Sequence, residues 1–153
     1  MKRILIGVSA TIVTVFLNAA SAGEDNMHSE GHHHGMSMMD TRTSLGLSAQ
    51  MKQRQLSNMR NHVETIKSIV GLIAENKFAD AAKIAHDKLG LSPEMNEMCN
   101  MFEDEKFRAL GFAFHRSGDD LGVALQTEDV HASLSALNKT MEYCVTCHAT
   151  YRQ

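Results

Sequence analysis

The sequence predicts an all-α fold in which amphipathic helices pack together as a bundle. From about residue 48 to the end of the chain, apolar residues recur at alternating spacings of three and four, the period of a helix with one buried face. The chain contains a single proline, and it stands where a helix is expected to begin. The length of 153 residues indicates one domain.

The first 22 residues are typical of a cleaved signal peptide. A positive Met-Lys-Arg segment at residues 1–3 precedes an apolar stretch at 4–17, and an Ala-Ser-Ala cleavage site follows at 20–22. The apolar stretch is shorter than the roughly 20 residues that span a membrane. We therefore expect an exported, periplasmic protein that begins at Gly23 and has no membrane attachment after cleavage.

Residues 23–43 differ in composition from the rest of the chain and are predicted to form a disordered arm. They contain almost no branched aliphatic residue and so cannot bury enough apolar surface to fold. Imidazole binds copper, nickel and zinc, and thioether binds copper(I), so the arm is a candidate for metal capture. The alternative is a solvated leader without a bound metal. If the arm binds metal, the candidate ligands are Met27, His28, His32, His33, His34, Met36, Met38 and Met39.

The first predicted helix runs from about Ser48 to Glu75, and we expect Asn76 to end it. Its apolar stripe consists of Leu56, Met59, Val63, Ile66, Val70 and Ile73. A shorter helix is predicted over Phe78–Leu89, with Gly90 as the residue that follows its end.

Ser92-Pro93-Glu94 has the composition of a helix start, with an N-cap, a proline at the first position and an acid in the first turn. Residues 95–102 either form a separate turn or continue into the third helix, predicted over Asp104–Gln126. Three glycines weaken the prediction of a continuous third helix, or else permit close approach of a neighbour: Gly111, Gly118 and Gly122.

The fourth predicted helix runs from about Glu128 to Tyr151 and contains the motif Cys144-Val-Thr-Cys147-His148. Its expected core-facing stripe is Val130, Leu134, Leu137, Met141, Cys144, His148 and Tyr151.

C-x-x-C-H is the attachment signal for a c-type haem. The two cysteines form thioethers to the porphyrin, and the histidine is the proximal iron ligand. Residues three and four apart share a helix face, so Cys144, Cys147 and His148 can all contact one macrocycle. The alternatives are a redox cysteine pair or half of a zinc site, but no second ligand pair has suitable spacing. The motif therefore predicts one covalent haem c.

The signal peptide, the four helices and the C-terminal motif together resemble the cytochrome c′ family, the class II c-type cytochromes that include c556-like members. The resemblance covers residues 48–153. Its most specific element is a haem motif near the end of the last helix, continued as C-H-x-x-Y-R by Tyr151 and Arg152. It implies an antiparallel four-helix bundle that encloses the haem, and frequently a homodimer through the first two helices.

The resemblance also implies haem contacts from the first helix. Arg54-Gln55 matches an Arg-Gln pair of the family, whose arginine lies near a haem propionate. The distal residue follows about one helical turn later. Four residues after Arg54 is Asn58, and four after Gln55 is Met59, which lies on the apolar stripe and is our expected distal iron ligand. The alternatives are Met59 as core filler, an open site lined by Met59 and Leu56, or ligation by Met51, His62 or Cys99.

Cys99 is the odd cysteine. It is open to three interpretations: a buried hydrophobic residue, a partner in an intermolecular disulfide, or an iron ligand.

These observations predict a periplasmic monohaem electron carrier that exchanges electrons with partner proteins. The alternatives are a five-coordinate haem module that binds NO or CO, and a haem protein whose His/Met-rich arm binds metal. We expect no enzymatic activity, because the sequence offers no paired carboxylates, no nucleophile with its base and no phosphate loop. The net charge of −3 becomes −5 when Lys2 and Arg3 are removed, so there is no electrostatic basis for nucleic-acid binding.

Overall fold

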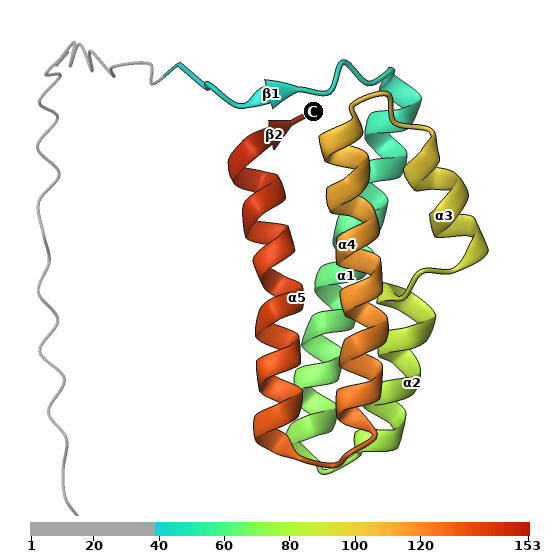
Figure 1. The fold of residues 1–153 in the computed structure, drawn as a ribbon, viewed down its shortest axis with the longest axis vertical. Coiled ribbons are helices and arrows are strands. Elements are labelled where there is room, and N and C mark those ends of the chain that lie inside the picture. The colour runs from blue at the N-terminus through green and yellow to red at the C-terminus, as the bar shows by residue number, and fades with distance from the viewer. Residues whose placement is uncertain (1–38) are drawn as a thin grey trace, which may run out of the picture. The chain divides into compact units, whose positions relative to one another are not determined.

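The computed structural model describes residues 39–153, and this part of the chain is mostly helical (Figure 1). The predicted signal peptide and most of the predicted arm lie outside these residues. Five helices and two short strands are present here: β1 (Thr43–Ser44), α1 (Ala49–Ala74), α2 (Phe78–Leu89), α3 (Pro93–Asn100), α4 (Glu105–Leu125), α5 (Val130–Thr150) and β2 (Tyr151–Arg152). The all-α prediction is confirmed. None of the helices in the described range is long and apolar enough to cross a membrane.

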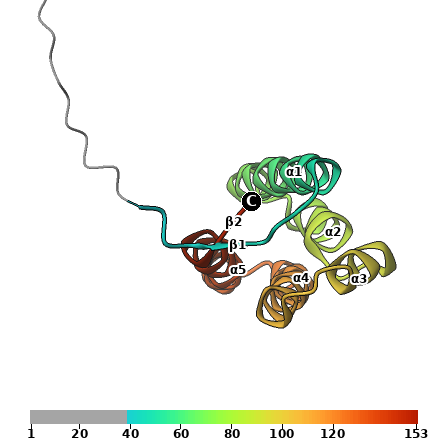
Figure 2. The same cartoon turned by 90° about the horizontal axis from the view of Figure 1, so that it is seen from above.

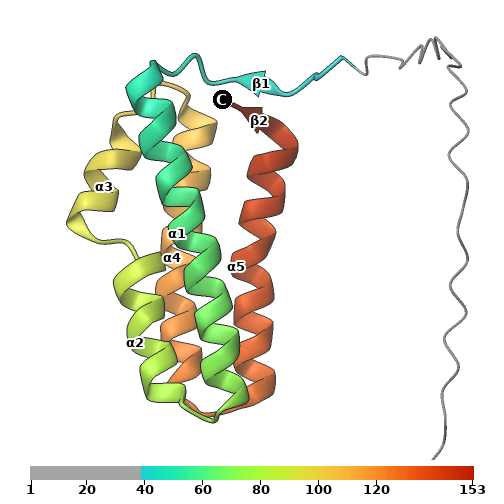
Figure 3. The ribbon, with the colours of Figure 1, turned by 180° about the vertical axis from the view of Figure 1, so that it is seen from behind.

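The four longer helices lie side by side, and each runs opposite to the next along the chain (Figures 1 and 3). Helix α2 packs against α1 and α4, and α4 packs against α5. The short helix α3 contacts α4 near the end of the molecule where the two strands lie. Viewed along the helices, the β1–β2 pair crosses that end between α5 and α1 (Figure 2).

The helix starts follow from capping side chains in the sequence. In each of four helices the side chain before the first turn accepts a hydrogen bond from a backbone N–H in that turn, and these caps are Ser48, Ser92, Asp104 and Asp129. The left-handed backbone of Asn76, with φ of 56°, ends α1 as predicted. Residues 95–102 do not continue into the third predicted helix, because α3 is a helix of its own that starts at Pro93 and ends at Asn100.

Gly90 ends α2, but not in the left-handed conformation of a C′ residue, because its φ is −66°. What this position requires is a small residue, since a Cβ atom would overlap the Asp119 side chain and the His86 carbonyl. Helix α4 is continuous, and Gly118 lets it approach α2: a Cβ atom there would lie 2.6 Å from the carbonyl oxygen of Leu89. The glycines of α4 therefore permit close packing and do not interrupt the helix.

Two apolar clusters form the core. The larger one joins α1, α2, α4 and α5 around the fully buried side chains of Ile69, Leu89, Leu121 and Leu125. The smaller one joins α3, α4 and the C-terminal residues, and it contains Met98, Phe102, Phe107 and Tyr151.

The prediction that the apolar stripes of the first and last helices face the core is wrong in part. On α1, Val63 is 68% exposed and Val70 is 47% exposed, while the buried side chains are His62, Thr65, Ile69 and Ile73. On α5, three apolar stripe residues are more than 40% exposed, namely Val130, Leu134 and Met141, and His148, which was also predicted to face the core, is exposed. The physical reason is that α1 and α5 do not pack closely along their lengths, so neither helix covers the apolar side chains of the other.

Candidate cofactor site

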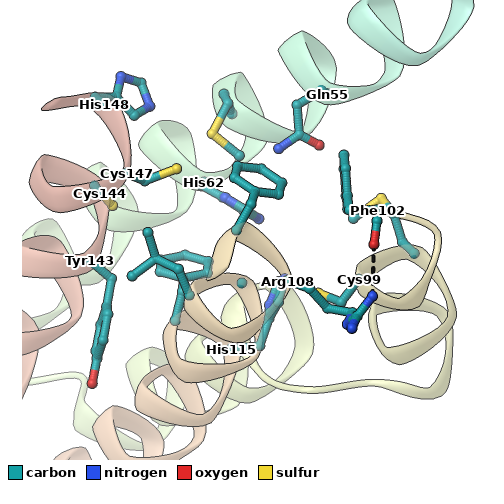
Figure 4. A pocket seen from close by; sticks show the side chains of 16 residues that line it. Gln55, His62, Cys99, Phe102, Arg108, His115, Tyr143, Cys144, Cys147 and His148 are labelled. Atoms are coloured by element: carbon teal, nitrogen blue, oxygen red, sulfur yellow. Dashed lines mark hydrogen bonds between the residues drawn. The ribbon is translucent and has the colours of Figure 1, made fainter. Parts of the chain in front are cut away.

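The C-x-x-C-H motif lies in the last two turns of α5 (Figure 4). Cys144 and Cys147 are partly buried, whereas His148 is exposed. All three residues line an apolar cavity of about 70 Å³ enclosed by α1, α3, α4 and α5. The structure thus brings together the three residues that the sequence singles out for haem attachment, within about one turn of one helix.

A second, larger cavity of about 540 Å³ adjoins the first and lies between α1 and the end of α5. Five residues line both cavities, namely Gln55, Met59, Phe107, Cys147 and His148. The volume of the larger cavity falls within the range of about 300–1,000 Å³ that is typical of cofactor and ligand sites. A flat apolar cofactor tethered at Cys147 therefore has room between α1 and α5.

An N-terminal strap, residues 40–45, closes one side of the larger cavity. Its strand β1 pairs in parallel with β2, and Thr43 is in register with Tyr151. Beyond the strands, the Leu45 N–H donates to the Arg152 carbonyl over 3.1 Å. The prediction that the disordered arm extends to residue 43 is therefore wrong for residues 40–43, which are held against the C-terminal segment. The remainder of the arm, up to residue 38, lies outside the described residues.

The environment of the two motif cysteines differs from that of a redox-active cysteine pair. Burial raises the pKa of the Cys144 thiol, and burial together with the neighbouring Cys144 raises that of Cys147. Redox-active pairs have lowered thiol pKa values because cations or helix N-termini stabilise the thiolate. In the range 39–153 no group of three His, Cys, Asp or Glu side chains is arranged to hold a metal ion.

The residues considered for the distal position do not all reach the site. Met59, His62 and Cys99 line the smaller cavity, and Leu56 lines the larger one. Met51 lines neither cavity and instead packs against the smaller apolar cluster. Met51 is therefore misplaced for iron ligation, whereas Met59, His62 and Cys99 share the smaller cavity with the motif.

His62 is a buried imidazole that faces the smaller cavity (Figure 4). Its side chain is 8% exposed, and its ring centroid lies 4.8 Å from that of Phe114 and 5.7 Å from that of His115. Burial, and secondarily the charge of His115, lowers the pKa of His62 to about 4. At neutral pH the ring is uncharged, so one ring nitrogen carries a free lone pair.

His115 is held by the backbone of α2. Its Nδ1 atom lies 2.8 Å from the Leu89 carbonyl oxygen, so the ring donates its Nδ1 hydrogen there. Burial lowers the pKa of His115 as well, which favours the neutral ring at this position.

Arg54 and Gln55 are the pair that the resemblance to the cytochrome c′ family singles out, and their side chains lie in different environments. Gln55 lines both cavities, whereas Arg54 lines neither. The Arg54 guanidinium lies 3.5 Å from a carboxylate oxygen of Glu94 on α3, and its side chain is 48% exposed. The residue expected near a propionate is therefore engaged elsewhere.

The cationic side chains that do line the larger cavity are Arg42, Lys52 and Arg152. Sequence reasoning missed Arg42 and Lys52 as site residues. Lys52 lies one turn after the N-cap of α1 and three positions before Gln55. Residues three apart share a helix face, so the sequence could have placed Lys52 on the same side of α1 as Gln55. Arg42 offers no local signal, because its position depends on a strand pair formed by the two ends of the described chain.

Cys99 is 4% exposed, and a Cβ atom added at Gly111 would lie 3.2 Å from its sulfur. Burial raises the pKa of this thiol. These properties are those of a small buried hydrophobic residue, and they leave the sulfur out of reach of another molecule's thiol in this conformation.

Comparisons of the chain with family models, with curated proteins and with solved structures found no significant match.

Proposed function

We propose that this protein is a periplasmic monohaem c-type cytochrome that transfers electrons. The observation that carries the proposal is that Cys144, Cys147 and His148, in the spacing of the haem-attachment signal, line the same apolar cavity between helices, and that Cys147 and His148 also line the larger cavity that adjoins it. The residues present fit the group, because the walls of the smaller cavity are apolar, while the larger cavity that adjoins it has a volume of about 540 Å³ and is lined by cationic side chains.

The roles of the residues follow from this placement. Cys144 and Cys147 would hold the porphyrin through thioether bonds, and His148 would bind the iron. The cofactor supplies a reversible one-electron change between ferric and ferrous iron, and the protein sets its potential through ligands, burial and hydrogen bonds. Phe107 and Met59 line both cavities and would exclude water from the macrocycle.

Electron transfer, in our proposal, occurs at the exposed side of the site, where His148 and the larger cavity reach the surface. The acidic mature chain favours partner proteins with basic docking patches. A homodimer remains a proposal, supported on α1 by the exposed residues Val63 and Val70, which are seven positions apart and so share one helix face.

The proposal is tested by producing the full chain in a host that attaches haem to exported proteins. We expect a mass increase of one haem and a thioether-type absorption spectrum, both lost in Cys144→Ala/Cys147→Ala. Cys99→Ala is the matched control, because it removes a thiol that lies outside the motif, and it should retain the haem. Bare sulfhydryls at Cys144 and Cys147 of the wild type would overturn the proposal.

A second candidate function is binding of a diatomic gas. The observation that favours gas binding is the smaller cavity, whose apolar walls also contain the uncharged imidazole of His62. The N–H of a neutral imidazole can donate a hydrogen bond to a small bound ligand. This function needs an iron position free of a native ligand. Formation of a nitrosyl complex by the reduced protein, without displacement of a sixth ligand, would favour gas binding over electron transfer.

Metal capture by the His/Met-rich arm remains a proposal that rests on the sequence alone. The comparison of full-length protein with a chain lacking residues 23–38 in a copper or zinc titration tests it, and equal uptake by both would overturn it.

A further inference from the structure

We propose that the N-terminal strap forms the anion-binding side of the cofactor site, with Arg42 and Arg152, assisted by Lys52, binding the two porphyrin carboxylates in place of Arg54. This inference rests on the proposed function, because it assigns residues to a haem held at Cys144 and Cys147.

The first support is position. The larger cavity adjoins the attachment residues, and the charged side chains that line it are Arg42, Lys52, Arg152 and one carboxylate, Asp40. A chain whose net charge is −3 thus gathers an excess of two positive side-chain charges at one cavity. Two is also the number of carboxylates on a haem, so the side-chain charge of the site matches that of the cofactor.

The second support is that the strap already binds a carboxylate. The Arg42 guanidinium contacts both oxygens of Asp40, with Nε 2.9 Å from Oδ1 and Nη2 2.8 Å from Oδ2. Arg152 approaches the same carboxylate, with Nε 3.9 Å from Oδ2. Hydrogen bonds from Arg42 hold the pKa of Asp40 at about 2. The two-pronged contact of Arg42 is the fork geometry that suits a propionate, and Arg152 adds a second positive charge close to the same carboxylate.

The third support is that the strap is fixed to the segment that would carry the haem. The Arg42 Nη1 atom donates to the His148 carbonyl oxygen over 3.1 Å, and Arg152 Nε donates to the Arg42 carbonyl oxygen over 3.3 Å. The strand pairing adds backbone hydrogen bonds between the same two segments. Arg42 of the strap and Arg152 of β2 are therefore held beside Cys147 and His148 at the larger cavity, whereas Arg54 lines neither cavity.

The test measures the reduction potential of the haem-loaded full chain and its dependence on pH. We expect Arg42→Gln and Arg152→Gln each to lower the potential, because a nearby cation disfavours the additional positive charge of ferric iron. Loss of a guanidinium should also raise the pKa of a propionate, which would strengthen the pH dependence near neutrality. Arg54→Gln is the matched control, since it removes the same charge from a side chain outside both cavities, and it should give a smaller shift.

A lower potential in Arg42→Gln could result from the lost charge or from a strap that is held less firmly. Arg42→Lys separates these two causes, because it keeps the positive charge but not the two-pronged contact. We expect its potential to lie between those of wild type and Arg42→Gln, with an unchanged far-ultraviolet circular dichroism spectrum. If Arg54→Gln lowers the potential as much as Arg42→Gln and Arg152→Gln do, or if these two variants leave the potential unchanged, the inference is overturned while the proposed function stands. A wild-type chain without covalent haem would overturn both.

Discussion

The guanidinium of Arg42 donates a hydrogen bond to the backbone carbonyl oxygen of His148, a residue 106 positions later in the chain. His148 lies in the last turn of α5, where helix carbonyls lack partners within the helix and carry partial negative charge. A cation from the other end of the described chain satisfies one of these carbonyls. The residue proposed to bind iron is thereby connected directly to the N-terminal strap.

The distal ligand can be assigned by substitution in the haem-loaded protein. We expect Met59→Ala to convert a low-spin ferric spectrum to a high-spin one, because it removes the thioether that lines both cavities. Met51→Ala is the control, since Met51 contacts neither cavity, and its spectrum should match that of the wild type. If Met59→Ala is also unchanged and His62→Phe alone alters the spin state, the ligand is His62.

We expect the stability of the protein to fall between about pH 6.5 and pH 4 because of His62. Its pKa is about 4 in the folded protein, below the value near 6.5 of an unfolded chain, so the unfolded state takes up protons first as the pH decreases. The contribution is fully present above pH 6.5, and the loss amounts to about 3 kcal/mol at most.

Urea unfolding at pH 7.5 and pH 4.5 measures this effect. His62→Leu should reduce the difference in unfolding free energy between the two pH values, whereas His131→Gln, a change at an exposed histidine, should not. An undiminished difference in His62→Leu would show that other groups cause the acid destabilisation.

Gly118→Ala should destabilise the protein by about 1–3 kcal/mol, because the added methyl group would overlap the Leu89 backbone, which cannot move as a side chain can. Gly71→Ala in α1 is the matched control. Among the described residues, nothing outside the adjoining backbone of α1 lies within 4 Å of the position its Cβ would take, so the change should stabilise the protein by about 0.5–1 kcal/mol through helix propensity. Thermal unfolding of the two variants checks both signs, and equal effects would contradict the close α2–α4 packing.

Ser133→Ala should leave the stability unchanged or increase it by up to about 1 kcal/mol. The Ser133 hydroxyl is fully buried and has no hydrogen-bond partner among the described residues, so its removal relieves an uncompensated loss of solvation. The comparison is Ser117→Ala, where the buried hydroxyl donates to the Phe114 carbonyl over 2.6 Å and should contribute about 1 kcal/mol. A larger loss for Ser133→Ala than for Ser117→Ala in urea unfolding would disagree with this assignment.

The helices could be predicted because their signals are local. Ser48, Ser92, Asp104 and Asp129 cap the first turns of their own helices, and Asn76 ends α1 through its own backbone conformation. The alternation of apolar residues is equally local, and it indicated the extent of each helix to within a few residues.

The outward direction of Val63 could not be predicted, because a stripe is buried only where a neighbouring helix covers it, and α1 and α5 do not pack closely. The direction of Arg54 has a similar cause, since it depends on Glu94 of α3, a helix whose existence the sequence left open. The site was therefore predictable at Cys144, Cys147 and His148, which lie on one helix, and not at Arg42, which reaches it from a distant segment.

The pairing of β1 with β2 has a consequence for the order in which the molecule assembles. Contacts within and between consecutive helices close short loops, whereas this two-residue ladder closes a loop of more than a hundred residues and gains few hydrogen bonds in return. The strap is therefore expected to dock late, after the helices have formed. Until then the strap does not close the larger cavity, so Cys147 and His148 stay accessible there, and the haem attachment that we propose is expected to precede docking of the strap.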